Sequence, residues 1–254
     1  MAELVPNYYR DSLPLDKNRM RSVENAGQVA LVKNISKPYT VTKGLQNRHI
    51  ALWHSHGWYY NNTLERWEWE RPRLWQTVED LFPLSFTLPY IVPMLENANA
   101  VVMLPRERDP QIHECIVDND APDTDHTFQI EGIKVLSDSL AGFSSNFEFL
   151  DHENPFFLGT AIQFLSDTIE SGTVSWTAAI PERGEYAVHI SYLRDSEQIM
   201  DAAYTVYHEG GQTDFFVNQS LGGPTWLYLG TFLFDPESSK QNRQLALSNQ
   251  SKTG

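Results

Sequence analysis

Hydrophobic and polar positions alternate with a period of two residues through much of the second half of the chain. In residues 173–180 the even-numbered positions are hydrophobic, and the same holds in residues 185–193. A Pro-Glu-Arg-Gly turn sequence at 181–184 separates the two runs. This alternation predicts two β-strands, each with one buried face. The side chains that we expect in the core are Val174, Trp176, Ala178, Ile180, Tyr186, Val188, Ile190 and Tyr192.

The same pattern continues toward the end of the chain. The Glu-Gly-Gly-Gln sequence at 209–212 lies between two apolar runs and is typical of a β-hairpin turn. Further strands are expected at residues 204–208, 213–219, 226–234 and 245–249. Short strands separated by Gly and Pro turns predict an antiparallel β-sandwich of jelly-roll type, which we place at residues 117–254.

The first half of the chain has a different pattern. Residues 1–47 are polar and punctuated by prolines, and we expect an extended lead-in that wraps a domain. A short strand is expected at 50–53, a helical segment broken by prolines at 74–97, and a buried parallel strand at 100–104. Strand, helix and strand form one βαβ unit. Residues 48–116 therefore predict an incomplete α/β domain, and the chain as a whole belongs to the α+β class.

Composition and charge narrow the classes of partner. The chain has 254 residues, 41% of them hydrophobic, and a net charge of −14. An acidic chain repels nucleic acid and anionic membrane surfaces, so neither is expected as a partner. No stretch has the length of a membrane span, and Met1 to Arg10 contain no apolar run of signal-peptide length. We expect either a cytosolic protein or an exported one whose signal is outside this sequence. The single cysteine, Cys115, leaves the redox compartment open.

Three blocks of sequence follow one another in the second half: SGTVSWTAAIPERGEYAVHISYL, AAYTVYHEGGQTDFFVNQ and GGPTWLYLGTFLFD. Together they resemble the golvesin/xanthan-lyase carbohydrate-binding-like domain, over about residues 117–251. The resemblance implies a β-sandwich accessory module attached to enzymes that act on polysaccharide or cell wall. It also implies polysaccharide or peptidoglycan as the partner, and a periplasmic or secreted location.

Three aromatic residues are candidates for stacking on a sugar. Tyr207 and Tyr228 fall out of phase with the predicted core positions, so their rings are expected on the exposed face of their strands. Trp226 is the third candidate, provided that its face of the strand is the open one. Large rings also fill cores, so a packing role remains open for each of them.

An acidic loop at 118–125 opens the region of the predicted sandwich. Asp118 and Asp120 offer carboxylates at alternate positions, which is the oxygen chemistry that Ca²⁺ prefers. The loop lacks the glycine and the final glutamate of an EF-hand, so a solvated turn is the alternative interpretation.

Two segments of the first half, HIALWHSHGWYY and QTVEDLFPLSFTLPYIVPMLENANAVVMLPRERD, are similar to the opening of a zinc-dependent N-acetylmuramoyl-L-alanine amidase. The similarity implies that His56 is the first zinc ligand, that Glu79 is the second, and that Arg106 lies in the loop after the second strand. A catalytic zinc takes three protein ligands and a water. The family's third ligand and its catalytic Glu have no counterpart in this sequence, so we expect the active site to be incomplete here.

These features favour an accessory protein directed at carbohydrate or cell wall, with binding carried by the sandwich. Three alternatives remain. The chain is part of a zinc amidase whose remaining catalytic part lies elsewhere, it is an accessory module of a xanthan-lyase-type polysaccharide lyase, or it is an interaction domain without a ligand.

Overall fold

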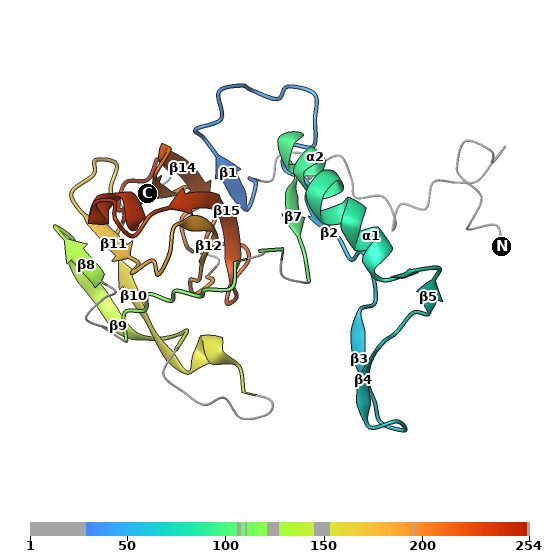
Figure 1. The fold of residues 1–254 in the computed structure, drawn as a ribbon. Coiled ribbons are helices and arrows are strands. Elements are labelled where there is room, and N and C mark those ends of the chain that lie inside the picture. The colour runs from blue at the N-terminus through green and yellow to red at the C-terminus, as the bar shows by residue number, and fades with distance from the viewer. Residues whose placement is uncertain are drawn as a thin grey trace, which may run out of the picture.

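The computed structural model describes residues 29–105, 108–109, 111–120, 127–144, 153–195 and 197–252. Figure 1 shows a layered β-structure formed by the later part of the chain, with a smaller unit of two helices and short strands beside it. This arrangement confirms the predicted α+β class with a C-terminal antiparallel β-sandwich. None of the helices in the described ranges is long and apolar enough to cross a membrane.

One layer of the sandwich is a six-stranded antiparallel sheet, here called sheet A, with the strand order β1-β14-β13-β16-β11-β8. Its strands are β1 (Val32–Asn34), β8 (Thr127–Glu131), β11 (Thr173–Thr177), β13 (Ala202–His208), β14 (Gly211–Val217) and β16 (Gln244–Ser248). The β13–β14 hairpin turns at Glu209-Gly210, as the sequence predicts. Gly211, with φ of 116°, begins β14 in a conformation that side chains rarely adopt.

The edge strand β1 comes from a part of the chain for which no strand was predicted. It lies inside the segment predicted as a lead-in, yet Val32 pairs with Val217 of β14, and the preceding Leu31 is 2% exposed. Three residues are too few for an alternating pattern to be recognised, so this strand was not predicted. The lead-in thus contributes to the C-terminal sheet.

The second layer of the sandwich consists of two separate two-stranded sheets. One is formed by β12 (Gly184–Ile190) and β15 (Leu227–Phe234), and the other by β9 (Val135–Gly142) and β10 (Gly159–Phe164). A short 3-10 helix at Pro155–Phe157 precedes β10, and another at Lys240–Arg243 precedes β16. The core between sheet A and β12–β15 contains Phe215 and Val217, which are at most 1% exposed. The eight predicted core side chains all belong to this cluster or pack against it, which confirms that prediction.

The smaller unit contains the predicted βαβ connection. Strand β2 (His49–Ala51) pairs in parallel with β7 (Val101–Met103). Between them run α1 (Leu81–Phe86), a π-helical segment (Thr87–Ile91) and α2 (Val92–Asn97). Pro83 is in the first turn of α1, where a missing N–H costs nothing, and Pro89 is in the π-helical segment. The helix begins later than predicted, because the preceding residues form the short hairpin β5 (Arg73–Leu74) and β6 (Thr77–Val78).

A second hairpin in this unit was not predicted. It consists of β3 (Trp58–Asn61) and β4 (Arg66–Trp69), and it projects away from the rest of the molecule in Figure 1. The aromatic and charged residues in this stretch gave no simple alternation of hydrophobic and polar positions. Contacts between rings on opposite strands, Trp58 with Trp69 and Tyr60 with Trp67, stabilise this hairpin.

The carboxylate of Asp80 holds the base of this hairpin. It is 2% exposed and accepts hydrogen bonds from the backbone N–H groups of His56 and Gly57, each at 3.0 Å, and of Arg71 at 3.1 Å. Burial opposes ionisation, but these three donors and the neighbouring His56 outweigh it, so the pKa of Asp80 lies below its ordinary value of 3.8. One ionised side chain therefore joins both ends of the hairpin to the start of α1.

We expect Asp80→Ala to lower the free energy of unfolding by about 1–3 kcal/mol at pH 7, because three buried N–H groups lose their acceptor. A carboxyl with a depressed pKa in the folded protein contributes stability above its unfolded pKa and loses that contribution as the pH falls through its folded pKa. The difference between wild type and variant should thus shrink below pH 3.8. Urea unfolding at pH 7 and pH 3 measures it. Glu79→Ala, at the exposed neighbouring position, is the control, and an equal effect of both variants would contradict the role of Asp80.

Candidate functional site

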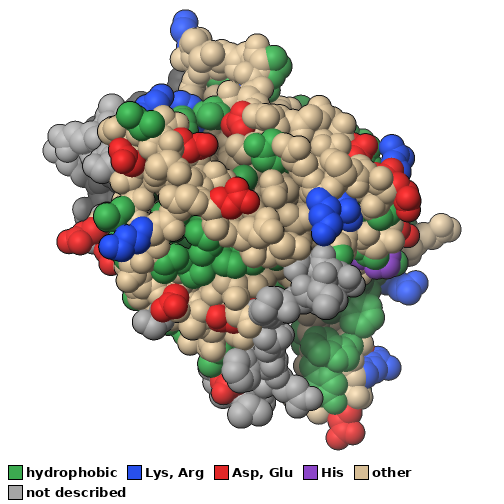
Figure 2. Space-filling view, turned by 90° about the vertical axis from the view of Figure 1, so that its left-hand side faces the viewer, with side chains coloured by type: hydrophobic (Ala, Val, Ile, Leu, Met, Phe, Trp, Pro, Cys, Tyr) green, Lys and Arg blue, Asp and Glu red, His purple; other side chains and the backbone are tan. Residues whose placement is uncertain are grey.

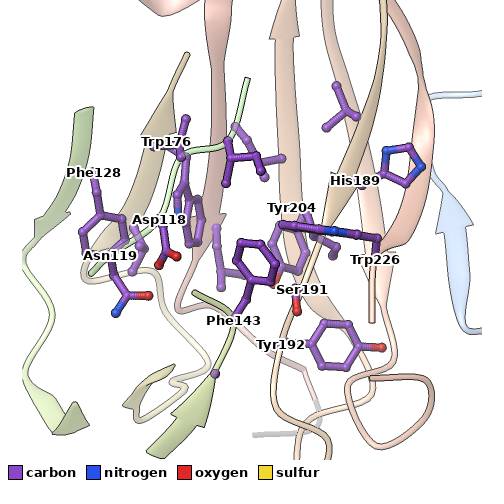
Figure 3. Close-up of a pocket in the computed structure, with 18 of the residues that line it drawn as sticks. Asp118, Asn119, Phe128, Phe143, Trp176, His189, Ser191, Tyr192, Tyr204 and Trp226 are labelled. Carbon is purple, nitrogen blue, oxygen red and sulfur yellow. The ribbon is translucent and has the colours of Figure 1, made fainter. Parts of the chain in front are cut away.

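The sandwich contains a cavity of about 620 Å³ between its two layers. The cavity is present because β9–β10 and β12–β15 are separate sheets, which leaves a seam in the layer opposite sheet A. Side chains of sheet A, including Trp176 and Tyr204, form its floor, and residues of β10 and β12 form its sides. Figure 3 shows these walls, with an extended segment that contains Asp118 and Asn119 running between them. The volume is in the range of small-molecule sites, about 300–1,000 Å³.

Three aromatic rings gather where the seam opens. Trp226 lies 4.7 Å from Phe143 and 5.6 Å from Phe156, and the two phenylalanine rings are 5.4 Å apart, measured between ring centroids. Phe143 follows β9, Phe156 is in the 3-10 helix, and Trp226 precedes β15. This aromatic trio thus connects the ends of the two separate sheets. The indole of Trp226 remains 41% exposed.

Polar groups line the cavity beside these rings. Asn119 donates a hydrogen bond from Nδ2 to Oγ1 of Thr160 at 2.9 Å, and Asp118 accepts one from the backbone N–H of Asp120 at 3.2 Å. Asp118 is 8% exposed. The other polar lining residues include Gln163, His189, Ser191, Gln198 and Gln244. The cavity thus combines aromatic surface with hydroxyl, amide and carboxylate groups.

Three tyrosines line the cavity, and burial raises the pKa of each. The pKa of Tyr192 rises to about 12, and those of Tyr186 and Tyr204 are also above their ordinary value. The hydroxyl of Tyr192 donates to the carbonyl oxygen of Leu221 at 2.6 Å, and that of Tyr204 accepts from Gln219 at 3.0 Å. These phenols are protonated at neutral pH, so each can donate and accept hydrogen bonds.

Residues 153–254 match the family model of the Golvesin C-terminal domain. The matched region, here called the golvesin-type domain for this similarity, contains β10 to β16, and with them Phe156, Tyr192, Tyr204 and Trp226. The predicted golvesin resemblance is confirmed for this region, which begins later than the predicted residue 117.

The comparison with solved structures gives one similar protein, a Paenibacillus xanthan lyase. The similarity has a TM-score of 0.41 and 20% sequence identity, and covers 55% of this chain. The matched region is 12% of that chain, so the lyase is much longer than the part compared. The search of curated proteins found no match.

The structure brings one of the three predicted sugar-stacking residues to the cavity. Trp226 is part of its lining. Tyr207 alternates with the buried Tyr204 and Val206 on β13, so it is on the outer face of sheet A. Tyr228 lies under the guanidinium group of Arg108, 3.5 Å from the ring centroid, at the junction between the golvesin-type domain and α2.

The two predicted calcium ligands, Asp118 and Asp120, lie beside the golvesin-type domain, at the edge of the cavity. Both carboxylate oxygens of Asp120 accept hydrogen bonds from Thr160, one from its backbone N–H and one from its hydroxyl. Asp120 therefore joins the extended segment to β10. Residues 121–125 of the predicted loop lie outside the described residues, and calcium binding stays a prediction.

The predicted zinc ligand His56 lies beside Arg71, with the carboxylates of Glu70 and Asp80 3.4 Å and 3.9 Å from its Nδ1, and zinc binding stays a prediction. Both ring nitrogens of His56 are 3.1 Å from the guanidinium group of Arg71. Glu79 has an exposed side chain, whereas its neighbour Asp80 faces His56 and is engaged by backbone N–H groups. No group of three or more His, Cys, Asp or Glu side chains in the described ranges is placed to hold a metal. Arg106 lies outside these ranges.

Phe143 and Phe156 were not predicted as site residues. Both lie outside regular alternation, Phe143 just after a strand and Phe156 behind a proline, so no periodic pattern distinguishes them. Their roles depend on contact with Trp226, about 70 to 80 positions away in the chain, which only the folded structure provides.

We expect the purified chain to take up no stoichiometric zinc, because a cationic guanidinium group lies against both nitrogens of His56. His56→Ala should behave in the same way. Metal analysis after dialysis and a calorimetric zinc titration test both proteins. One equivalent of tightly bound zinc that is lost in His56→Ala would contradict this expectation and restore the hydrolase hypothesis.

Proposed function

We propose that the golvesin-type domain is a carbohydrate-binding module that holds a segment of polysaccharide at the aromatic trio. The observation that carries this proposal is the exposed indole of Trp226 at the edge of a large cavity lined by polar side chains. Trp226 does not stand alone, because Phe143 and Phe156 lie against it, and a contiguous aromatic surface is more typical of a binding site than a single exposed ring.

The chemistry of a sugar ring matches both parts of the site. One face of the ring consists of C–H groups, which pack on an aromatic plane, and its rim carries hydroxyl groups, which exchange hydrogen bonds with amides and carboxylates. Trp226 and Phe143 supply the aromatic surface, and Asn119 and Gln163 supply amides in the same cavity. An apolar wall with a few placed polar groups is the usual composition of a specific ligand site.

The cavity tyrosines support binding in preference to catalysis. A lyase that removes a proton from an acidic sugar needs a base, and a tyrosine serves as one only when it is deprotonated. Burial raises the pKa of Tyr186, Tyr192 and Tyr204 further above neutrality, and each hydroxyl already has a hydrogen-bond partner within the protein. We therefore propose an accessory role beside an enzyme, with the reaction performed elsewhere.

The ligand class proposed is a polysaccharide outside the cytoplasm, either an exopolysaccharide of the xanthan type or the glycan of peptidoglycan. The acidic character of the chain, with net charge −14, supports a neutral polymer or one whose charged groups lie away from the bound face. A periplasmic or secreted location is part of this proposal.

Trp226→Ala should weaken binding to soluble polysaccharide about tenfold, since loss of one stacking ring removes about 0.5–1.5 kcal/mol or slightly more. Affinity electrophoresis in gels containing xanthan or soluble peptidoglycan measures the change. Tyr207→Ala, which removes a ring from the outer face of sheet A, is the matched control and should bind like wild type. Circular dichroism of both variants checks the fold, and wild-type affinity of Trp226→Ala would refute the proposed site.

A further inference from the structure

The β3–β4 hairpin carries four aromatic rings on one of its faces. In its register Trp58 lies opposite Trp69, and Tyr60 lies opposite Trp67. Residues two apart on a strand point to the same side, so the two pairs share one face. The rings within each pair meet edge to face, with centroids 5.1 Å and 5.7 Å apart. We call this surface the aromatic ribbon.

The opposite face of the hairpin carries Tyr59 together with polar side chains that hydrogen-bond to one another. Glu68 accepts a hydrogen bond from Asn61 at 3.0 Å and one from Nε of Arg66 at 2.9 Å. Asn61 also accepts from the backbone N–H groups of Thr63 and Leu64 and so fixes the turn. Asp80 holds the base of the hairpin and Asn61 holds its turn, so the hairpin is ordered without a ligand. A preformed surface loses little conformational entropy on binding.

The aromatic ribbon is open to solvent. Trp58 is 56% exposed, Tyr60 45% and Trp67 61%. Figure 2 shows hydrophobic side chains along the projection at the lower right, which reaches as low as the β3–β4 hairpin does in Figure 1. Three large exposed rings on one small face form an apolar surface of the kind that marks a binding site.

We propose that the aromatic ribbon is a second carbohydrate-binding surface, on which consecutive rings of a polysaccharide stack. This inference rests on the proposed function and extends it to the N-terminal unit. The two ring pairs are two residues apart along the strands, a distance of about 7 Å. Such spacing, on the scale of neighbouring sugar rings in a chain, favours an extended polymer over a single sugar.

The charge of this surface disfavours nucleic acid and anionic lipid as ligands of the aromatic ribbon. Exposed aromatic rings also stack on nucleobases, but such surfaces require free cationic groups for the phosphates. Arg66, in the hairpin, is ion-paired with Glu68 at 2.5 Å, and Arg71, just after it, is ion-paired with Glu70 at 3.1 Å. The net charge of −14 adds long-range repulsion of any polyanion with dense charge.

The area of the aromatic ribbon is too small for it to be the interface with a second copy of the chain. A stable protein interface takes about 20–30 residues from each side. The ribbon presents four side chains on a narrow two-stranded hairpin, so it provides a fraction of that area. A polysaccharide needs no more than a few stacking rings. A polymer long enough to contact both the ribbon and the cavity would gain affinity from the linked sites.

Fluorine NMR of protein labelled with 5-fluorotryptophan tests each site by itself. The chain has seven tryptophans, and single Trp→Phe variants assign their resonances. Xanthan oligosaccharides and soluble peptidoglycan fragments are the probes. We expect the Trp58 and Trp67 resonances to shift in a saturable manner, both in the wild type and in Trp226→Ala.

Each outcome of this titration decides between the two sites. A shift of Trp226 without Trp58 and Trp67 overturns the ribbon and leaves the proposed function intact, and the converse overturns the cavity site alone. No shift with either probe overturns both. Shifts of Trp58 and Trp67 that depend on protein concentration, or that appear with phosphatidylcholine vesicles and not with saccharide, overturn the ribbon in favour of self-association or membrane contact.

Affinity measurements with variants give an independent check. The double variant Trp58→Ala, Trp67→Ala should lower the affinity for long xanthan chains about tenfold or more. Tyr59→Ala is the matched control, because Tyr59 is an exposed ring on the opposite face of the same strand. Trp67→Phe retains a ring and the hairpin fold, and should lose less affinity. Equal binding by the double variant and by Tyr59→Ala would overturn the proposal.

Discussion

Burial of apolar side chains between sheet A and the β12–β15 pair is the constraint on which the rest of the structure depends. Phe215, Val206 and Val217 are almost wholly buried on one side, and Ile190 and Phe234 meet them from the other. This contact fixes the distance and direction between the two layers. It also determines where the second layer ends, because the β12–β15 pair covers only part of a six-stranded sheet.

The cavity follows from how the remaining part is covered. The register of β9 and β10 shifts twice, between Ala161 and Gln163 and between Gln163 and Phe164. Such irregularities bend a strand pair and end its regular pairing, so β9–β10 does not continue the β12–β15 sheet. The aromatic trio joins the two pairs at one end, and the extended segment with Asp118 and Asn119 fills part of the gap. The proposed ligand site is thus present because the layer opposite sheet A is not one continuous sheet. The aromatic trio, and not backbone hydrogen bonds, connects its two strand pairs.

The N-terminal unit has a much smaller core, made of Val92, Ala100 and Val102 with a few partly buried neighbours. Polar interactions therefore have a larger share in its organisation. The Asp80 carboxylate connects the hairpin to the helix, and the Arg108–Glu96 ion pair lies where this unit meets β15. A charged clamp of this kind positions the aromatic ribbon without burying it, which leaves the rings available for contact.

The sequence by itself determined the α+β class, the βαβ connection and the strands of the sandwich from residue 173 onward, because alternation of buried and exposed positions is a local property of a strand. It also pointed to Trp226. Tertiary structure alone decided that β1 joins sheet A, that Phe143 and Phe156 meet Trp226, and that Asp80 and not Glu79 faces His56. It likewise decided that the rings around Trp58 and Trp67 lie on one face of a hairpin. These features depend on contacts between distant segments or on which of two neighbouring carboxylates is buried, and no local pattern encodes either.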